Sequence, residues 1–315
     1  MSSNLIKLAL KDLQITQKEL ALRLGVSPAQ ITKWKADEYM SRDMSEKIKG
    51  ILDLDQLDPD VVYWTGGVKE ANKWYTLVEY LAEMAEENAE CNYNTQPFDD
   101  DMGLLLFYVL RSLTEAGIEI PKTFPADIDF DYSMDYDENE ELFDSLIRVN
   151  PYSSLIYELL IAWAQLYDFY AAFVSDITYD DELGLFEDCR ELEFCLPPLA
   201  LTKIGKENEL LTNYNDFRYK TEKYSEKLIN EIKRQAVKAG HPLKAELYHL
   251  ISRDPGSLVH EAEAEAFGFN DDRIHPDVYM NEILTNLRLI HQVLPAICEK
   301  LDVELTIERS ELSAR

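Results

Sequence analysis

The chain has 315 residues, and its 46% hydrophobic content excludes wholesale disorder. Its 31 Lys and Arg against 60 Asp and Glu give a net charge of −29, which excludes general binding of nucleic acid over the whole surface. The four cysteines are scattered with no CxxC motif, and the first residues do not form a signal peptide, so we expect a reduced, cytoplasmic protein.

The charge is unevenly distributed along the chain. Residues 1–55 carry nine basic and eight acidic residues, which leaves 22 basic and 52 acidic residues for the rest. A near-neutral N-terminal part therefore precedes a strongly acidic one. Such an excess commonly serves solubility alone, but it also suits a protein that contacts an anionic partner at one end only.

Three short helices are expected at the start of the chain. A helix over 4–13 is expected first, with Leu5 and Leu8 turned inward. Residues 16–35 (TQKELALRLGVSPAQITKWK) then predict helices over 17–24 and 28–35, joined at Gly25-Val26. Ser27 followed by Pro28 is a helix start signal, because the hydroxyl accepts from a free amide and proline has none. This arrangement describes a helix-turn-helix, whose second helix enters a DNA major groove.

Seven residues of this stretch resemble the lambda-repressor/Cro-type (XRE) helix-turn-helix family: Gln17, Ala21, Gly25, Val26, Ser27, Ile31 and Trp34. The resemblance covers about residues 4–55, and no family is identified for the remainder. It implies double-stranded DNA as a partner, with Gln17 holding a phosphate and the exposed face of helix 28–35 reading bases. The alternative is an ordinary helical hairpin with solvated side chains at these positions.

The resemblance places the DNA-binding residues at Gln17, Ser27, Ala29, Gln30, Thr32, Lys33, Lys35 and Arg42. Pro28 and Ala29 depart from the common pattern because neither donates a bidentate hydrogen bond. Ala29 can meet a thymine methyl, Gln30 can bond adenine or a phosphate, and Lys33 can reach guanine O6 and N7. Lys35 and Arg42 are expected to contact phosphates. With so little direct readout, DNA shape is expected to contribute to recognition.

A fourth helix is expected over 44–54, and residues 56–68 (QLDPDVVYWTGGV) are expected to be a linker. Its apolar Val61, Val62 and Trp64 indicate that the linker docks on the folded protein. The linker can also supply the fifth helix that is usual in the resembled family. The body then follows with helices expected over 69–91, 102–116, from 140 to 149, 152–177, 181–196, 216–239, 242–251, 258–267 and 276–301, and a short strand over 303–308.

Three of these body segments carry specific expectations. Helix 152–177 is apolar nearly all round and is the expected centre of the body; Glu158, Gln165 and Asp168 argue against a membrane span. The Pro197-Pro198 pair is expected to end helix 181–196, and Pro295 to kink the last helix. The apolar side of helix 277–301 is the candidate homodimer interface, the alternative being core.

Residues 127–144 hold nine carboxylates and no cation. Their acids fall at positions 1, 3, 5, 9 and 12 of an EF-hand loop, but Tyr132 stands where that loop needs glycine. A solvated acidic loop is the simplest interpretation. A third hypothesis is that the run mimics phosphate and folds over Lys33, Lys35 or the basic helix 218–238.

No pattern for catalysis is found. The five histidines lack metal-ligand spacing, His260-Glu261 lacks the second histidine of HExxH, and there is no GxGxxG, P-loop or GxSxG. We therefore assign no catalytic residue, no metal and no cofactor, and we do not expect an enzyme.

Together these patterns predict an all-α protein with a four- or five-helix helix-turn-helix domain (1–55), a docked linker (56–68) and a larger acidic α-helical body (69–315) for dimerisation or effector binding. The expected function is a sequence-specific transcriptional regulator, a homodimer that reads a palindromic operator through helix 28–35. Two alternatives remain open at this point. One is an acidic DNA mimic that captures a basic partner, and the other is a helical-repeat regulator whose body senses a peptide or small ligand.

Overall fold

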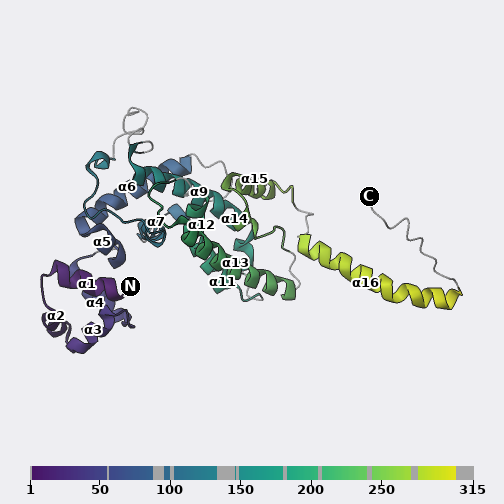
Figure 1. Ribbon diagram of the computed structural model, residues 1–315, viewed down its shortest axis with the longest axis horizontal. Coiled ribbons are helices and arrows are strands. Elements are labelled where there is room, and N and C mark those ends of the chain that lie inside the picture. Colours follow the sequence, from purple (N-terminus) through teal and green to yellow (C-terminus); the bar gives the residue numbers. More distant parts are fainter. Residues whose placement is uncertain are drawn as a thin grey trace.

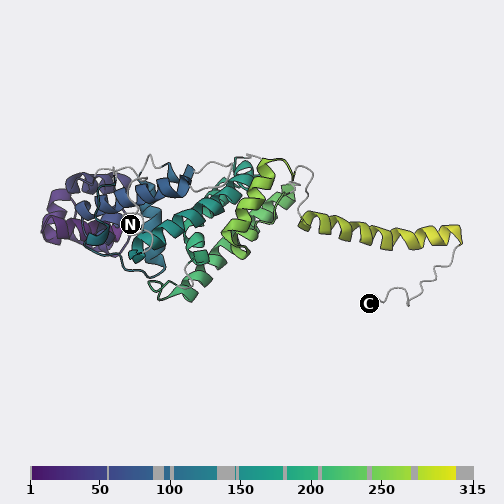
Figure 2. The same ribbon diagram turned by 90° about the horizontal axis from the view of Figure 1, so that it is seen from above.

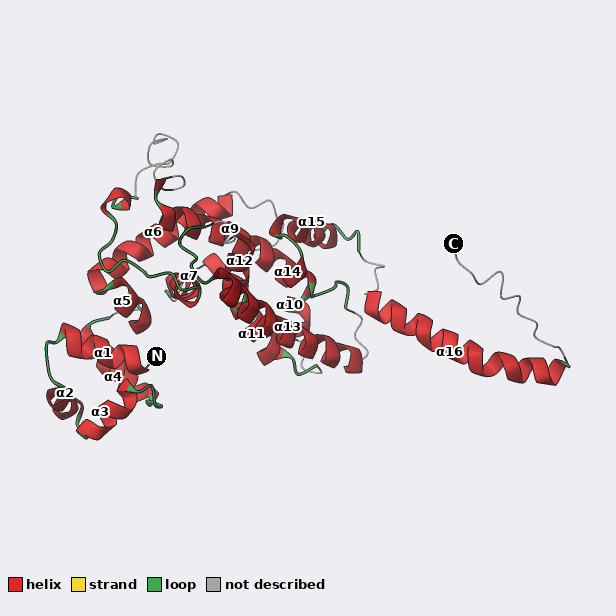
Figure 3. Cartoon of the chain, viewed as in Figure 1, coloured by secondary structure: helices red, strands yellow, loops and turns green. Residues whose placement is uncertain are grey.

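The computed structural model describes residues 2–54, 57–87, 96–99, 103–132, 146, 149–179, 183–204, 208–239, 243–270 and 276–302. Every regular element within these ranges is a helix (Figure 3), which confirms the all-α fold class. No helix in this part of the chain is both long and apolar enough to cross a membrane.

Four helices form one end of the molecule, which we call the head (Figure 1). They are α1 (Ser2–Asp12), α2 (Gln17–Leu24), α3 (Pro28–Lys35) and α4 (Arg42–Leu52). Ile6, Leu20, Ile31 and Ile48 meet in the core of the head with no exposed surface. The bounds of α2 and α3 are those expected, whereas α4 begins and ends two residues early. It ends there because Asp53 takes a left-handed conformation, with φ of 52°.

The segment expected to be a docked linker contains a helix of its own, α5 (Pro59–Thr65). Asp58 caps this helix, its side chain accepting from the amide of Asp60, and Pro59 takes the first position. Val61 and Val62 are buried. The helix packs against α1 on one side and against α6 (Val68–Glu87) and α7 (Leu104–Glu115) on the other. It is therefore a fifth helix between the head and the body.

The centre of the body is α9 (Pro151–Phe173), against which α6, α12 (Leu196–Ile204) and α15 (Pro255–Ala266) pack. Its cap is Asn150, whose side-chain oxygen accepts from the amides of Tyr152 and Ser153. The expected helix 152–177 is divided, because α9 ends at Phe173 and the short α10 (Ser175–Thr178) follows.

Two proline-containing turns begin helices rather than end them. The expectation that Pro197-Pro198 ends a helix is wrong, because α11 (Phe186–Phe194) ends earlier and the prolines lie in the first turn of α12. Proline is tolerated in a first turn because its missing amide has no partner there. Pro255 likewise opens α15 behind the cap Asp254. The helix expected over 242–251 is reduced to α14 (His249–Ser252).

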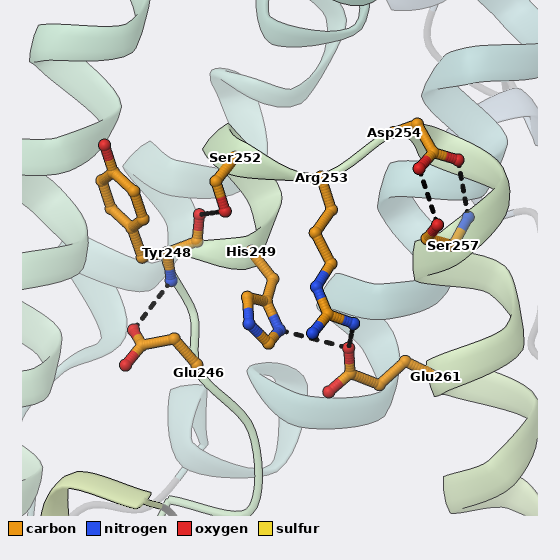
Figure 4. A network of polar contacts seen from close by, with 8 residues as sticks. All are labelled: Glu246, Tyr248, His249, Ser252, Arg253, Asp254, Ser257 and Glu261. Carbon is orange, nitrogen blue, oxygen red and sulfur yellow. Dashed lines mark hydrogen bonds and ion pairs between the residues drawn. The ribbon is translucent and has the colours of Figure 1, made fainter. Parts of the chain in front are cut away.

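The corner between α14 and α15 is held by a buried carboxylate (Figure 4). Glu261 is 8% exposed, and its Oε2 lies 3.2 Å from Nδ1 of His249 and 3.1 Å from Nη1 of Arg253. Lys203 donates to the carbonyl oxygen of Arg253 over 2.9 Å, and burial lowers the pKa of Lys203 to about 8. His249 therefore helps to hold this corner through its contact with the Glu261 carboxylate.

The basic stretch of the body lies on α13 (Tyr214–Ala239). Several of its cations pair with nearby carboxylates, among them Arg218 with Glu222, Lys220 with Asp216 and Lys233 with Glu246. The positive charge of α13 is therefore largely neutralised by carboxylates of the body.

The described beginning of the acidic run lies at the surface of the body. Asp127 accepts from Asn150, and Asp129 pairs with Lys73 of α6. Most of the run and the strand expected over 303–308 fall outside the described residues.

The last helix, α16 (Pro276–Leu301), extends away from the body in both views (Figures 1 and 2). Leu287 and Ile290 on its apolar side are each 55% exposed. The alternative that this side is core is therefore wrong for a single chain.

Candidate nucleic-acid interface

The local sequence fixes the angle between α2 and α3. Thr16 and Glu19 cap α2 reciprocally: the Thr16 hydroxyl accepts from the Glu19 amide, and the Glu19 carboxylate accepts from the Thr16 amide over 2.7 Å. The carboxylate accepts from the Thr16 amide and also from the Thr16 hydroxyl, and these two hydrogen bonds lower the pKa of Glu19. Gly25 ends α2 with φ of 74°, and the Ser27 hydroxyl accepts from the amide of Gln30 to start α3.

The inner face of α3 anchors it to the head. Ile31 and Trp34 are buried, and Nε1 of Trp34 donates to the carbonyl oxygen of Tyr39 over 3.1 Å. Ala21 is buried on α2, where a small side chain allows the two helices to lie close together. The opposite face of α3 is consequently turned outward.

The structure brings the expected DNA-binding residues to this outward face and its margins. Ala29, Thr32, Lys33 and Lys35 of α3 are exposed, as are Ser27 and Arg42 at the starts of α3 and α4. Gln30 and Gln17 are half-buried, and the Thr32 hydroxyl donates to Oε1 of Gln17 over 3.5 Å. None of these eight side chains is buried against the body.

Lys33 has an intramolecular partner that the sequence analysis missed. Its Nζ lies 3.5 Å from Oε2 of Glu38, and both side chains are 56% exposed. The two side chains meet because Asp37, with φ of 65°, turns the chain back after α3. A search for helical i,i+4 pairs does not find this contact, because the two residues are five positions apart. Such an exposed pair contributes about 1 kcal/mol or less, so Lys33 leaves it at little cost.

A second residue missed from the sequence is Tyr39. It lies in the turn after α3 and is 87% exposed, although its carbonyl is fixed by Trp34. The signal in the sequence was an aromatic residue within the otherwise polar connection 36–43, next to the expected DNA-binding helix. Its phenol adds a hydrogen-bonding group beside α3.

Helix α1 ties α3 to α5 and so fixes the head relative to the body. The Ser3 hydroxyl donates to the carbonyl oxygen of Lys35 over 2.8 Å, and the Ser3 amide donates to Asp37. One residue later, Asn4 donates to Asp60 of α5 over 3.0 Å. In Figure 1, α2 and α3 accordingly lie at the end of the molecule, with α1 and α5 between them and the acidic body.

Comparison with known proteins identifies the head alone. Residues 6–47 match a family described as helix-turn-helix, which spans α2, α3 and the turn between them. No curated protein and no solved structure matches the chain. The family is one of DNA-binding domains, so this head implies binding to double-stranded DNA. The N-terminal region of this chain is a helix-turn-helix domain of the XRE type.

Proposed function

We propose that this protein is a sequence-specific transcriptional regulator that inserts α3 into the major groove of its operator. The observation that carries the proposal is the outward face of α3, which is exposed over Ala29, Thr32, Lys33 and Lys35 while its inner face is anchored by Trp34. The near-neutral head presents this face, and the acidic body lies on the other side of α1 and α5. The family match of residues 6–47 supports the same reading.

Within this proposal the side chains divide into two roles. Lys33, Gln30 and Ala29 face base edges, where they discriminate among base pairs. Gln17, Lys35 and Arg42 contact phosphates, which sets the position of α3 but carries no sequence information. The Thr32 hydroxyl lies 3.5 Å from Oε1 of Gln17, which places the phosphate contact beside the reading helix. Ser27 serves mainly through its cap of α3.

We propose further that the heads act in pairs, as a homodimer at least. Helix-turn-helix heads of this kind read two half-sites about 34 Å apart, one turn of the double helix. The operator is therefore expected to be roughly palindromic.

Two alanine substitutions separate the two roles. Lys33→Ala is expected to lose about 1–3 kcal/mol of preference at one base pair, because a contact to the base edge is removed. Gln17→Ala is expected to weaken binding to all sequences alike, because only a phosphate contact is lost. Binding is measured after selection of sites from random DNA, with Lys69→Ala in α6 as a control that removes a cation from the body.

Identical sequence preferences for the parent and Lys33→Ala would contradict the role of Lys33. Failure to select any site would contradict the regulator itself. In that case, stoichiometric recovery of a basic protein with the tagged chain would favour the alternative of an acidic interaction protein.

A specific observation favours a second, compatible activity, ligand sensing by the body. A cleft of about 380 Å³ lies between α7 and α13, with Tyr108 and Phe194 stacked in its wall at 5.6 Å. Phe107, which precedes Tyr108 on α7, stacks on Trp64 of α5 with ring centroids 5.9 Å apart. An effector in this cleft would therefore contact α7, which packs against α5, the helix between the head and the body.

Ligand sensing predicts a stabilisation that depends on this cleft. Small-molecule fractions of a cell extract are expected to raise the unfolding temperature of the parent, because a ligand that binds only the folded state stabilises it. Thr221→Trp places an indole in the cleft and is expected to abolish the rise. An equal rise for both proteins would place the ligand elsewhere.

A further inference from the structure

Helix α16 presents an apolar side that no other described element covers extensively. Leu287, Ile290, Leu294, Ile297 and Leu301 are all exposed on it, Leu301 to 67%. In water such a row of aliphatic side chains is unfavourable over a helix of 26 residues, about 39 Å long. The observation that requires explanation is this exposed row.

The spacing of the row is that of a coiled coil. From Ile283 to Leu301 the aliphatic residues are separated by four, three, four, three and four positions: 283, 287, 290, 294, 297 and 301. This is a seven-residue repeat, which keeps one narrow side of a helix facing its partners when the helices supercoil. Pro295, which removes one backbone hydrogen bond inside α16, falls at the outward b position of the repeat, and the helix continues past it to Leu301.

The identity of the residues indicates how many helices meet. The a positions are leucine (Leu287, Leu294 and Leu301), and the d positions are isoleucine (Ile283, Ile290 and Ile297). In parallel coiled coils, leucine at a with isoleucine at d favours assemblies larger than two strands, whereas the reverse order favours two. Leu284 and Val293 at the flanking e and g positions widen the apolar side beyond a and d, and four helices bury more of this wider side than two do.

The charge of the chain indicates that the partner is a second copy of α16. Among its 26 residues the helix has three acids and two bases, with none at an a or d position. The rest of the protein is strongly acidic, so two bodies repel each other. Contact through the nearly neutral α16 adds no like charges at the interface, and identical helices in a parallel bundle place leucine against leucine and isoleucine against isoleucine.

We propose that four copies of this chain assemble through α16 as a parallel, four-stranded coiled coil. A parallel arrangement puts the four bodies at one end of the bundle. If the heads bind DNA as proposed above, the assembly carries two pairs of heads. The assembly itself does not depend on that function.

The mass of the full chain in solution, without DNA, tests the proposal. Light scattering behind a sizing column is expected to give about 146 kDa, four times the 36.4 kDa of one chain. Ile290→Asp puts a charge into the contact and is expected to give about 36 kDa. Leu289→Asp is the matched control at an outward c position of similar exposure, and it is expected to keep the mass of the parent.

A composition-preserving variant tests the number of strands. Exchanging the two residue types in L287I/I290L/L294I/I297L puts isoleucine at a and leucine at d, and we expect about 73 kDa, two chains. A parent of one, two or three chains, an Ile290→Asp variant that stays tetrameric, or an exchange without effect would overturn the proposal. A tetramer that selects no DNA site would contradict the proposed function alone. A monomer that selects one would contradict this inference and the pairing of heads, but not sequence-specific DNA binding.

Discussion

Trp34→Ala is expected to lower the free energy of unfolding by about 3–5 kcal/mol and to abolish DNA binding. The Trp34 side chain is 5% exposed beneath α3, and its Nε1 donates to the carbonyl oxygen of Tyr39. Alanine would leave a cavity under α3 and release the turn that follows it. Because base contacts require the helix to be held in position, affinity is lost although no DNA-facing side chain changes.

Two control variants separate the causes of this loss. Trp34→Phe keeps most of the buried surface and removes only the N–H donor, so it is expected to cost about 1–3 kcal/mol for the unsatisfied carbonyl. Leu22→Ala changes a side chain that is 83% exposed on α2 and is expected to stay within about 0.5 kcal/mol of the parent. Urea denaturation followed by circular dichroism measures all three. A fully stable Trp34→Ala variant would show that α3 is held by other contacts.

Gly66→Ala is expected to destabilise the junction of head and body by about 2–5 kcal/mol. Gly66 ends α5 with φ of 96°, a conformation that costs any residue with a Cβ atom. A Cβ added there would also lie 2.6 Å from the carbonyl oxygen of Lys122 in the backbone of the body. Both effects act at the same point, so the segment around Lys122 has to move away from α5.

Gly50→Ala is the matched control for this change. Gly50 lies inside α4, and an added Cβ would meet nothing within 4 Å. Alanine is expected to stabilise the protein there by about 0.5–1 kcal/mol, because it restricts the unfolded chain and favours the helix. Equal stability of the two variants, measured in urea, would show that α5 does not pack against the Lys122 segment as described.

The junction that Gly66 serves is held by several further contacts. Nζ of Lys122 donates to the carbonyl oxygens of Tyr63 and Trp64 at the end of α5, over 2.9 and 2.5 Å. Burial, and after it the charge of Lys11, lowers the pKa of Lys122. Lys11 itself donates to the carbonyl oxygen of Gly66 from α1. The head is thus joined to the body by a packed helix, so α3 has a defined direction relative to the body.

Elements with local signals were predictable from the amino-acid sequence. The end of α2 and the start of α3 follow from Gly25 and Ser27, because a left-handed glycine or a cap acts through hydrogen bonds to backbone groups a few residues away. The buried Ile31 and Trp34 follow from helical periodicity for the same reason. Asn150 caps α9 and Pro276 opens α16, so the starts of these helices also depend on local signals.

Features that depend on packing between distant segments could not be predicted in this way. The position of helix 59–65 is set by α1, α6 and α7, which pack against it, and Glu38 meets Lys33 because a left-handed Asp37 turns the chain back. The apolar side of α16 is compatible with core or interface on periodicity alone, since both bury one face of a helix. Its exposure in the folded chain excludes the core of a single chain, because burial depends on which surfaces the rest of the fold leaves available.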